Sequence, residues 1–201
     1  MLCGGMSTRM GQDKGQMLFN EKPMIINILE TVENHADEVV LVLRDEKQIN
    51  IYKSIIEKYE SNKLGFNLKI VKDEIKNQGP LIGIITGLKY VKSDYALVLP
   101  CDSPLISAVF VENIFNAIEK SKEYHDTVVP KWDSGDIEPL HSIYPQKSQE
   151  LVKSLLSNGK KDVKSLIKLL NVYFIKVEKL DPSKSSFKNF NNPKDIEKYL
   201  K

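Results

Sequence analysis

The sequence predicts an α/β fold: a single Rossmann-like domain with a mostly parallel sheet and helices on both faces. Apolar runs of strand length alternate with amphipathic stretches of helix length along the whole chain. The apolar runs are continuous, as expected of parallel strands that are covered on both faces. No repeat and no linker rich in glycine, serine or proline divides the 201 residues. We therefore expect residues 1–201 to form one domain.

The expected elements follow one another in a regular order. A short apolar strand at residues 1–3 runs directly into a glycine-rich loop. Pro23 and Pro80 begin two of the helical stretches, where the first turn tolerates a missing N–H. Right-handed crossovers then place the carboxyl ends of the parallel strands at one edge of the sheet. Further strands are expected at 39–43, 68–71, 95–99, 127–129 and 171–175, and helices at 23–35, 48–59, 81–91, 107–121 and 146–156.

Composition excludes several classes of protein. Lys and Arg number 29 against 27 Asp and Glu, so no strong field favours nucleic acid or a membrane surface. No apolar run approaches the ~18 residues of a membrane span, and no secretory signal precedes the first loop. The two cysteines, Cys3 and Cys101, are too few for a disulfide framework. We expect a cytoplasmic monomer.

The loop at residues 4–15 predicts a binding site for a nucleoside triphosphate. It carries glycines at 4, 5, 11 and 15 and two cations, Arg9 and Lys14. Glycines let peptide N–H groups approach phosphate oxygens closely, and the cations neutralise phosphate charge. A P-loop is excluded because Gly11 is followed by Gln-Asp-Lys, and the spacing also differs from the dinucleotide fingerprint.

Two carboxylates follow predicted strands. Asp73 comes after the strand at 68–71, and Asp102 after the strand at 95–99, between two prolines. Ligands of open α/β sheets bind beyond the carboxyl ends of the strands. Because Mg²⁺ prefers few protein carboxylates together with phosphate oxygens, Asp102 is the candidate ligand. The alternatives are an N-cap for the helix near 107 in the case of Asp102, and an exposed loop position for Asp73.

At this point the sequence resembles a known family. Residues 2–14, Leu-Cys-Gly-Gly-Met-Ser-Thr-Arg-Met-Gly-Gln-Asp-Lys, are similar to the L-x-G-G-x-S-x-R-M-G-x-D-K signature of the molybdenum cofactor guanylyltransferases, the MobA-type nucleotidyltransferases. Residues 79–83 resemble the family's G-P-L-x-G, residues 100–104 its P-C-D-x-P, and residues 189–195 its N-x-N-T-P-x-D. The blocks keep the family order, and Asp13 with Lys14 favours the guanylyl branch.

The resemblance implies a reaction and a set of site residues. GMP passes from GTP to the terminal phosphate of Mo-molybdopterin, and pyrophosphate leaves. Because the attacking phosphate is already a nucleophile, positioning and charge neutralisation supply most of the rate. The implied GTP-binding residues are Leu2, Cys3, Gly4, Gly5, Lys14, Asp73, Gly79, Pro80, Leu81, Gly83 and Asp102. The implied catalytic residues are Arg9, Lys14 and Asp102, with Mg²⁺ on Asp102, and the implied molybdopterin contacts are Asn189 and Asn191.

Alternatives stay open beside this interpretation. Cys3 stands where the family more often has Ala, and Asn192 where it has Thr. The chain could instead be a cytidylyl- or other NTP transferase of the same fold, or a GTP-binding protein without catalysis. Residues 191–193 suit the cap of the last helix, residues 138–140 match loosely a segment that faces the pterin, and His141 suits a half-buried strand. The expected partners are the two substrates, with transient contacts to molybdopterin-loading proteins and acceptor molybdoenzymes.

Overall fold

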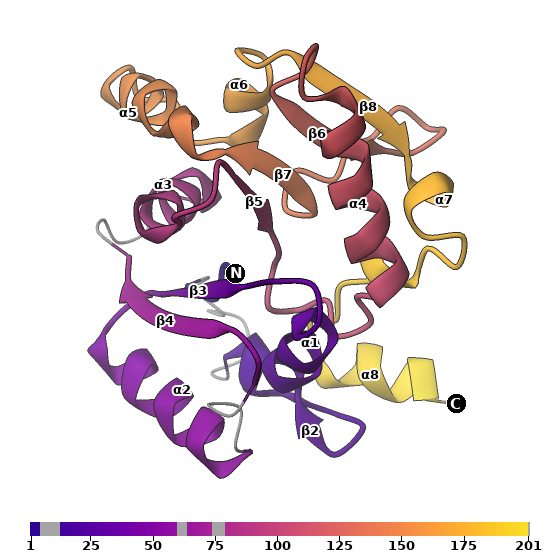
Figure 1. The fold of residues 1–201 in the computed structure, drawn as a ribbon. Coiled ribbons are helices and arrows are strands. Elements are labelled where there is room, and N and C mark those ends of the chain that lie inside the picture. The colour runs from indigo at the N-terminus through magenta and orange to yellow at the C-terminus, as the bar shows by residue number, and fades with distance from the viewer. Residues whose placement is uncertain (5–12, 60–63, 74–78, 201) are drawn as a thin grey trace.

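The fold is organised around strands that share one edge for their carboxyl ends. The computed structural model describes residues 1–4, 13–59, 64–73 and 79–200 (Figure 1). β3 (Glu38–Leu43) pairs in parallel with β4 (Asn67–Lys72). β5 (Tyr95–Val98), β7 (Ser142–Pro145), β6 (Thr127–Lys131) and β8 (Val172–Lys176) form a second group in that spatial order. Leu2 joins the two groups through parallel bridges to Val42 and Pro100.

One strand departs from the parallel pattern. β7 runs antiparallel to both β5 and β6, whereas β6 and β8 are parallel. β6 and β7 are joined by residues 132–141, which contain no helix. A connection without a crossover helix returns the chain in the opposite direction. The predicted α/β class with a mostly parallel sheet is confirmed, with β7 as its antiparallel member.

Helices cover both faces of the sheet, as predicted. Alternate residues of β3 show why: Leu41 and Leu43 enter one buried cluster, and Val40 and Val42 another. Both faces of the strand are therefore apolar. The first face carries α1 (Met24–Val32), α2 (Glu46–Lys58), α4 (Ala108–Ser121) and α7 (Val177–Leu180), and the opposite face carries α3 (Pro80–Tyr90), α5 (Gln149–Ser157) and α6 (Val163–Ile167).

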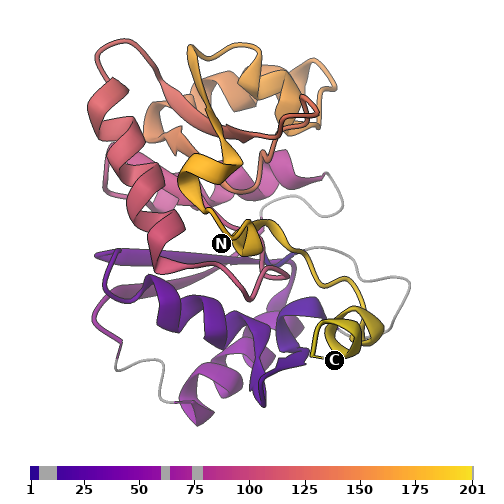
Figure 2. The ribbon, with the colours of Figure 1, turned by 90° about the vertical axis from the view of Figure 1, so that its right-hand side faces the viewer.

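The carboxyl-terminal segment returns to the amino-terminal half of the molecule. Figures 1 and 2 show α8 (Pro193–Leu200) beside the region of α1 and of the small hairpin β1 (Leu18–Phe19) and β2 (Lys22–Pro23). Phe190 stacks on Phe19 at 5.4 Å between ring centroids, within an apolar cluster that includes Ile196. Residues 189–192 are thereby held at the edge where the strands end. No helix in the described part of the chain is long and apolar enough to cross a membrane.

Candidate functional site

A cavity of about 600 Å³ lies beyond the carboxyl ends of β3, β4 and β5. It is where the expected site residues of three separate strand ends meet. Those that line it are Leu2, Cys3, Gly4, Lys14, Asp73, Gly79, Pro80, Gly83, Asp102 and Asn189. Arg9 and Gly5, also expected in the site, lie outside the described residues.

The charged centre of the cavity is an ion pair. Lys14 Nζ lies 2.8 Å from Asp102 Oδ2, and the two side chains are 31% and 14% exposed. The same Nζ donates to Asn191 Oδ1 at 2.5 Å. Asp102 Oδ1 has no hydrogen-bond partner among the described residues. Three residues that the sequence separates widely therefore form one cluster.

Asp13 fixes the backbone that carries Lys14. It is the N-cap of a short 3₁₀ helix, Lys14–Gln16, and its Oδ1 accepts from the backbone N–H of Gly15 at 3.1 Å. The Tyr52 hydroxyl donates to the same oxygen at 2.7 Å, and Gln48 Nε2 donates to the other carboxylate oxygen. Burial raises the pKa of Tyr52 well above its ordinary value, so its hydroxyl remains a donor. This capping role of Asp13 was not predicted, and the sequence could not show the partners of Asp13 on α2.

The amino end of α3 forms another wall. Gly79 precedes Pro80 with φ +82°, a left-handed conformation that a side chain disfavours, and a Cβ there would lie 3.1 Å from the Lys161 carbonyl oxygen. The first turn of a helix presents unpaired N–H groups, which suit an anion or the polar edge of a base. Gly83 allows Leu2 to approach closely, since an added Cβ would lie 3.1 Å from Leu2 Cδ2.

Two expected residues on this wall have different surroundings. Asp73 Oδ1 accepts from Thr86 Oγ1 at 3.0 Å while the residue lines the cavity, so it is held by α3 rather than freely exposed. Leu81 was expected in the base pocket, but its side chain is fully buried in the core under α3, α5 and α6. The helical repeat turns position 81 away from the face that carries Pro80 and Gly83.

The far wall contains a polar network. His141 Nε2 lies 3.2 Å from Ser103 Oγ, which donates to Asn189 Oδ1. Glu138 Oε1 accepts from Trp132 Nε1 at 2.7 Å, and its Oε2 lies 3.7 Å from His141 Nδ1. Although burial raises the pKa of Glu138, its interactions with His141 and Trp132 lower it below the ordinary value, so a carboxylate faces this side.

Sequence reasoning placed His141 wrongly. It was expected as a half-buried strand residue, but it is 1% exposed, immediately precedes β7, and lines the cavity. The alternation of apolar and polar residues around His141 indicated partial burial, but it contained no signal for the polar side chains of Ser103 and Glu138 that lie beside it. Residues 138–140, matched only loosely from the sequence, also line the cavity.

The expectation that residues 191–193 form the cap of the last helix is confirmed. Asn192 Oδ1 accepts from the Asp195 N–H at 3.1 Å, as a helix cap does. The Asp195 carboxylate in turn accepts from the N–H groups of Asn191 and Asn192. The backbone of Asn191 thus belongs to the cap of α8, while its side chain reaches Lys14. Asp102 is not a cap, because Ser107 fills that role for α4.

The oxygen donors of the cavity fit Mg²⁺. Within the described residues no three His, Cys, Asp or Glu side chains cluster as a metal cage. Mg²⁺ needs no such cage when one carboxylate and the phosphate oxygens of a substrate share it. Asp102 offers the Oδ1 that has no partner among the described residues, with the amide oxygens of Asn189 and Asn191 nearby. A cation beside a hard carboxylate at a cavity mouth is suited to bind a nucleotide with its metal and to stabilise charge on a transferring phosphate.

Known proteins resemble this chain over most of its length. Residues 1–174 match the family described as MobA-like NTP transferase domain. A probable molybdenum cofactor guanylyltransferase of Methanothermobacter thermautotrophicus is 38% identical over 196 residues, which cover 98% of this chain and 95% of that protein. The crystal structure of molybdopterin-guanine dinucleotide biosynthesis protein A from Archaeoglobus fulgidus superposes with a TM-score of 0.77 and 26% identity, covering 98% of this chain and 93% of that one. The 4-diphosphocytidyl-2C-methyl-D-erythritol synthase of Anaerococcus prevotii, at 17% identity and TM-score 0.71 over 99% and 95% of the two chains, shares the fold.

Proposed function

Since this chain belongs to the MobA-like NTP transferase family, we propose that it is a molybdenum cofactor guanylyltransferase, active as one nucleotidyltransferase domain over residues 1–201. It transfers GMP from GTP to the terminal phosphate of molybdenum-loaded molybdopterin and releases pyrophosphate. The contact of Lys14 with both Asp102 and Asn191 supports this most strongly. It brings a phosphate-loop cation, a metal-ligand carboxylate and an acceptor-side amide to one point.

On the GTP side, Lys14 and Asp102 form an ion pair whose two members can exchange each other for parts of the substrate. With no substrate bound, Lys14 and Asp102 neutralise each other. With Mg²⁺ and GTP bound, Asp102 would hold the metal and Lys14 Nζ would contact phosphate oxygens, so each charged side chain would exchange its present partner for one in the substrate complex. Bound Mg²⁺ supplies charge neutralisation at the reacting phosphate and orients the pyrophosphate. The α3 amino end at Gly79 and Pro80 receives the nucleoside, with Asp73 beside it.

On the acceptor side, Asn189 and Asn191 position the molybdopterin phosphate. An oxygen of that phosphate forms a bond to the α-phosphorus of GTP, and the bond from that phosphorus to the bridging oxygen breaks as pyrophosphate leaves. No general base is required, since the attacking oxygen carries a negative charge already. The chain's contribution is to align the two phosphates and to neutralise their charge, with Lys14 and Arg9 as the cations.

We also propose a cellular location and an oligomeric state for the protein. Cys3 and Cys101 are both free and buried, which suits a reducing cytoplasm. We place the protein there as a monomer that contacts molybdopterin-loading proteins and acceptor molybdoenzymes transiently.

One assay separates the candidate functions. Protein and Mg²⁺ are incubated with Mo-molybdopterin and each NTP in turn, and pyrophosphate is measured. Release with GTP alone is expected, and reactions without Mo-molybdopterin serve as the control. Release with CTP instead would favour the cytidylyl alternative. Tight GTP binding without pyrophosphate release would favour the non-catalytic one.

A further inference from the structure

A relay of four polar side chains connects Asn189, which is proposed to position the acceptor phosphate, to Glu138. Glu138, His141, Ser103 and Asn189 follow one another within contact distance. Ser103 is fully buried, whereas the other three line the nucleotide cavity. The reaction described above uses Asn189 alone, so the roles of the three residues behind it are open.

The His141 ring is held in place by aromatic packing. It is almost completely buried, and the rings of Phe110 and Phe187 meet it edge to face, at 6.2 and 5.3 Å between centroids. Its Nε2 lies 3.2 Å from Ser103 Oγ, and its Nδ1 lies 3.7 Å from Glu138 Oε2. An apolar side chain would fill this place without the cost of burying polar atoms, so the two nitrogens indicate a polar role.

The hydrogen bonds of Ser103 fix the direction of donation along the relay. A hydroxyl has one proton, and Ser103 donates it to Asn189 Oδ1. Towards His141 the Ser103 oxygen can then only accept, so His141 Nε2 carries the proton between them. On the other side of the ring, a proton on Nδ1 completes an ion pair with the Glu138 carboxylate.

This direction decides which end of the Asn189 amide faces the cavity. The main chain beside it is fixed, because the Phe190 N–H donates to the Asp102 carbonyl oxygen at 2.8 Å. Since Asn189 Oδ1 accepts from Ser103, the Nδ2 group points away from Ser103, and it has no hydrogen-bond partner among the described residues. An NH₂ group donates to a phosphate oxygen, whereas in the reverse orientation the amide oxygen would repel it.

We propose that His141 and Ser103 are positioning residues for the acceptor substrate: His141, paired with Glu138, donates to Ser103, and Ser103 holds the Asn189 amide with its NH₂ group towards the acceptor phosphate. This inference rests on the proposed function, in which Asn189 contacts that phosphate. His141 and Ser103 act through Asn189 and form no bond to the reacting groups. Their loss should therefore weaken the use of the acceptor and leave the use of GTP unchanged.

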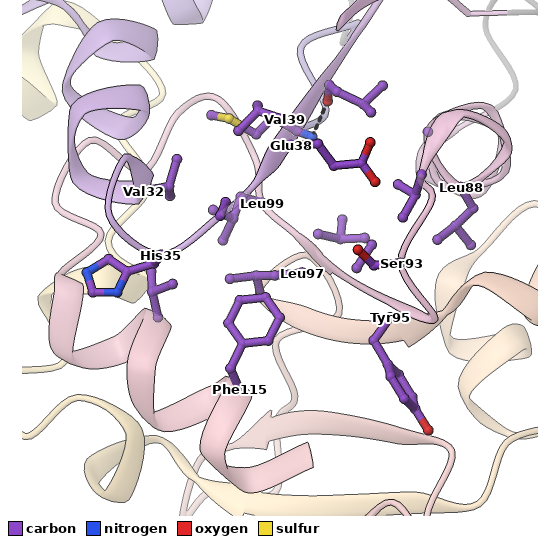
Figure 3. A pocket seen from close by; sticks show the side chains of 18 of the residues that line it. Val32, His35, Glu38, Val39, Leu88, Ser93, Tyr95, Leu97, Leu99 and Phe115 are labelled. Carbon is purple, nitrogen blue, oxygen red and sulfur yellow. Dashed lines mark hydrogen bonds between the residues drawn. The ribbon is translucent and has the colours of Figure 1, made fainter. Parts of the chain in front are cut away.

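A second histidine supplies a matched control. Figure 3 shows His35 in the lining of another cavity, of about 500 Å³, together with Val32 and Phe115. Its Nδ1 lies 3.8 Å from a carboxylate oxygen of Glu112, a contact similar to that of His141 with Glu138. No serine or asparagine side chain of the described residues extends this contact, and Asn189 does not line that cavity. His35→Phe should leave the KM of both substrates unchanged.

The first test compares two replacements of His141. His141→Gln keeps an N–H donor within reach of Ser103 Oγ, and His141→Phe keeps the aromatic packing against Phe110 and Phe187 but has no donor. We expect His141→Phe to raise the KM for Mo-molybdopterin about tenfold or more, which corresponds to the loss of one hydrogen bond to a charged group. His141→Gln should restore most of that loss. A role in packing alone predicts the reverse order, and that order would overturn the proposal.

Ser103→Ala tests the middle of the relay with the smallest change in volume. The KM for Mo-molybdopterin should rise by a similar factor, and the KM for GTP should not change. Because Ser103 adjoins Asp102 in the sequence, a general disturbance of the site would raise the KM for GTP as well, which would contradict the proposal. The control is Ser121→Ala, which removes another buried hydroxyl, one that donates to a main-chain oxygen in α4, and should change neither KM.

A double-mutant cycle tests whether Ser103 acts through Asn189. Once Asn189→Ala has removed the amide, Ser103→Ala should raise the KM for Mo-molybdopterin no further. Additive effects of the two substitutions would show that Ser103 acts by another route, and they would overturn the relay. Melting temperatures of all variants check that each protein is folded.

The last readout does not depend on turnover. Ring ¹⁵N spectra of the full chain without substrates should show a proton on His141 Nε2, with His141→Gln identifying the signal. An unprotonated Nε2 would mean that Ser103 donates to His141, and it would overturn the proposal even if transfer is normal. A protonated Nε2 in a chain that transfers no GMP would instead refute the proposed function and leave the hydrogen-bond direction standing.

Discussion

Replacing Asp102 by Asn tests the centre of the site with little change in shape. The variant keeps the volume of the side chain but removes its charge from an ion pair that is 14% exposed on the Asp102 side and 31% exposed on the Lys14 side. Such a pair lies between the exposed and the buried limits, so we expect a loss of about 1–2 kcal/mol in unfolding free energy. For a chain of this length that lowers the melting temperature by about 2–8 °C. The protein remains folded.

The effect on turnover is expected to be far larger. Asp102 is the carboxylate proposed to hold Mg²⁺ at the reacting phosphate, an interaction that contributes several kcal/mol to the transition state. A loss of about 4 kcal/mol corresponds to a decrease in turnover of about 10³-fold. Pyrophosphate release from GTP and Mo-molybdopterin measures it. The exposed Asp136, whose carboxylate accepts from Ser134, supplies the control substitution Asp136→Asn, which should retain full turnover.

The effect of Mg²⁺ on GTP affinity gives a second measurement, in which the parent and Asp102→Asn should differ. In the parent chain Lys14 is neutralised by Asp102, and Mg²⁺ should tighten GTP binding by taking over that carboxylate. In Asp102→Asn, Lys14 is released to the nucleotide without metal, so Mg²⁺ should no longer tighten binding. Near-normal turnover, or an unchanged Mg²⁺ effect on affinity in calorimetry, would refute the reasoning.

Three further predictions follow from the same structure. Gly79→Ala should cost about 1–2 kcal/mol and raise the KM for GTP, because a Cβ at φ +82° would lie 3.1 Å from the Lys161 carbonyl oxygen; urea unfolding and steady-state kinetics measure both. Tyr52→Phe removes the hydrogen bond that holds Asp13, so it should lower kcat with only a small loss of unfolding free energy. An unchanged kcat would contradict the role of Tyr52 in positioning the backbone that carries Lys14. For Asp181, burial raises the pKa but hydrogen bonds from two serines lower it below its ordinary value, so its stabilisation is present above about pH 4 and is lost as pH falls through the lowered pKa. The difference in unfolding free energy between the parent and Asp181→Asn should therefore be about 2 kcal/mol at pH 7 and shrink progressively as the pH is lowered below about 4; a constant difference would contradict it.

The regular elements were predictable because each depends on local pattern. The continuous apolar run of β3 reflects burial on both faces, and Pro80 marks the start of α3. The direction of β7 was not readable, since it depends on a connection that contains no helix. The burial of the Leu81 side chain was not readable for a related reason: the family block gave the residue's neighbourhood, but its position on the helix decided its side-chain contacts.

The sequence predicted single residues of the candidate site but not the contacts between them. The glycine-rich loop and the strand-end carboxylate suggested a nucleotide with a metal, and the family blocks supplied the acceptor side. The ion pair of Lys14 with Asp102 and the link to Asn191 arise only when distant segments fold together. The partners of Asp13 on α2 and the burial of His141 are likewise tertiary, and a local pattern contains no signal for them.

The contact between Lys14 and Asn191 joins positions 177 residues apart, close to the two ends of the chain. During synthesis the phosphate loop and the strand ends leave the ribosome long before the segment at 189–191. The proposed acceptor side of the cavity therefore cannot form before residues 189–191 have emerged, because contacts of such high sequence separation need both partners. A chain that stops before residue 189 would retain the proposed nucleotide wall and lack the proposed acceptor wall. Transfer should therefore depend on residues 189–191 as well as on the phosphate loop.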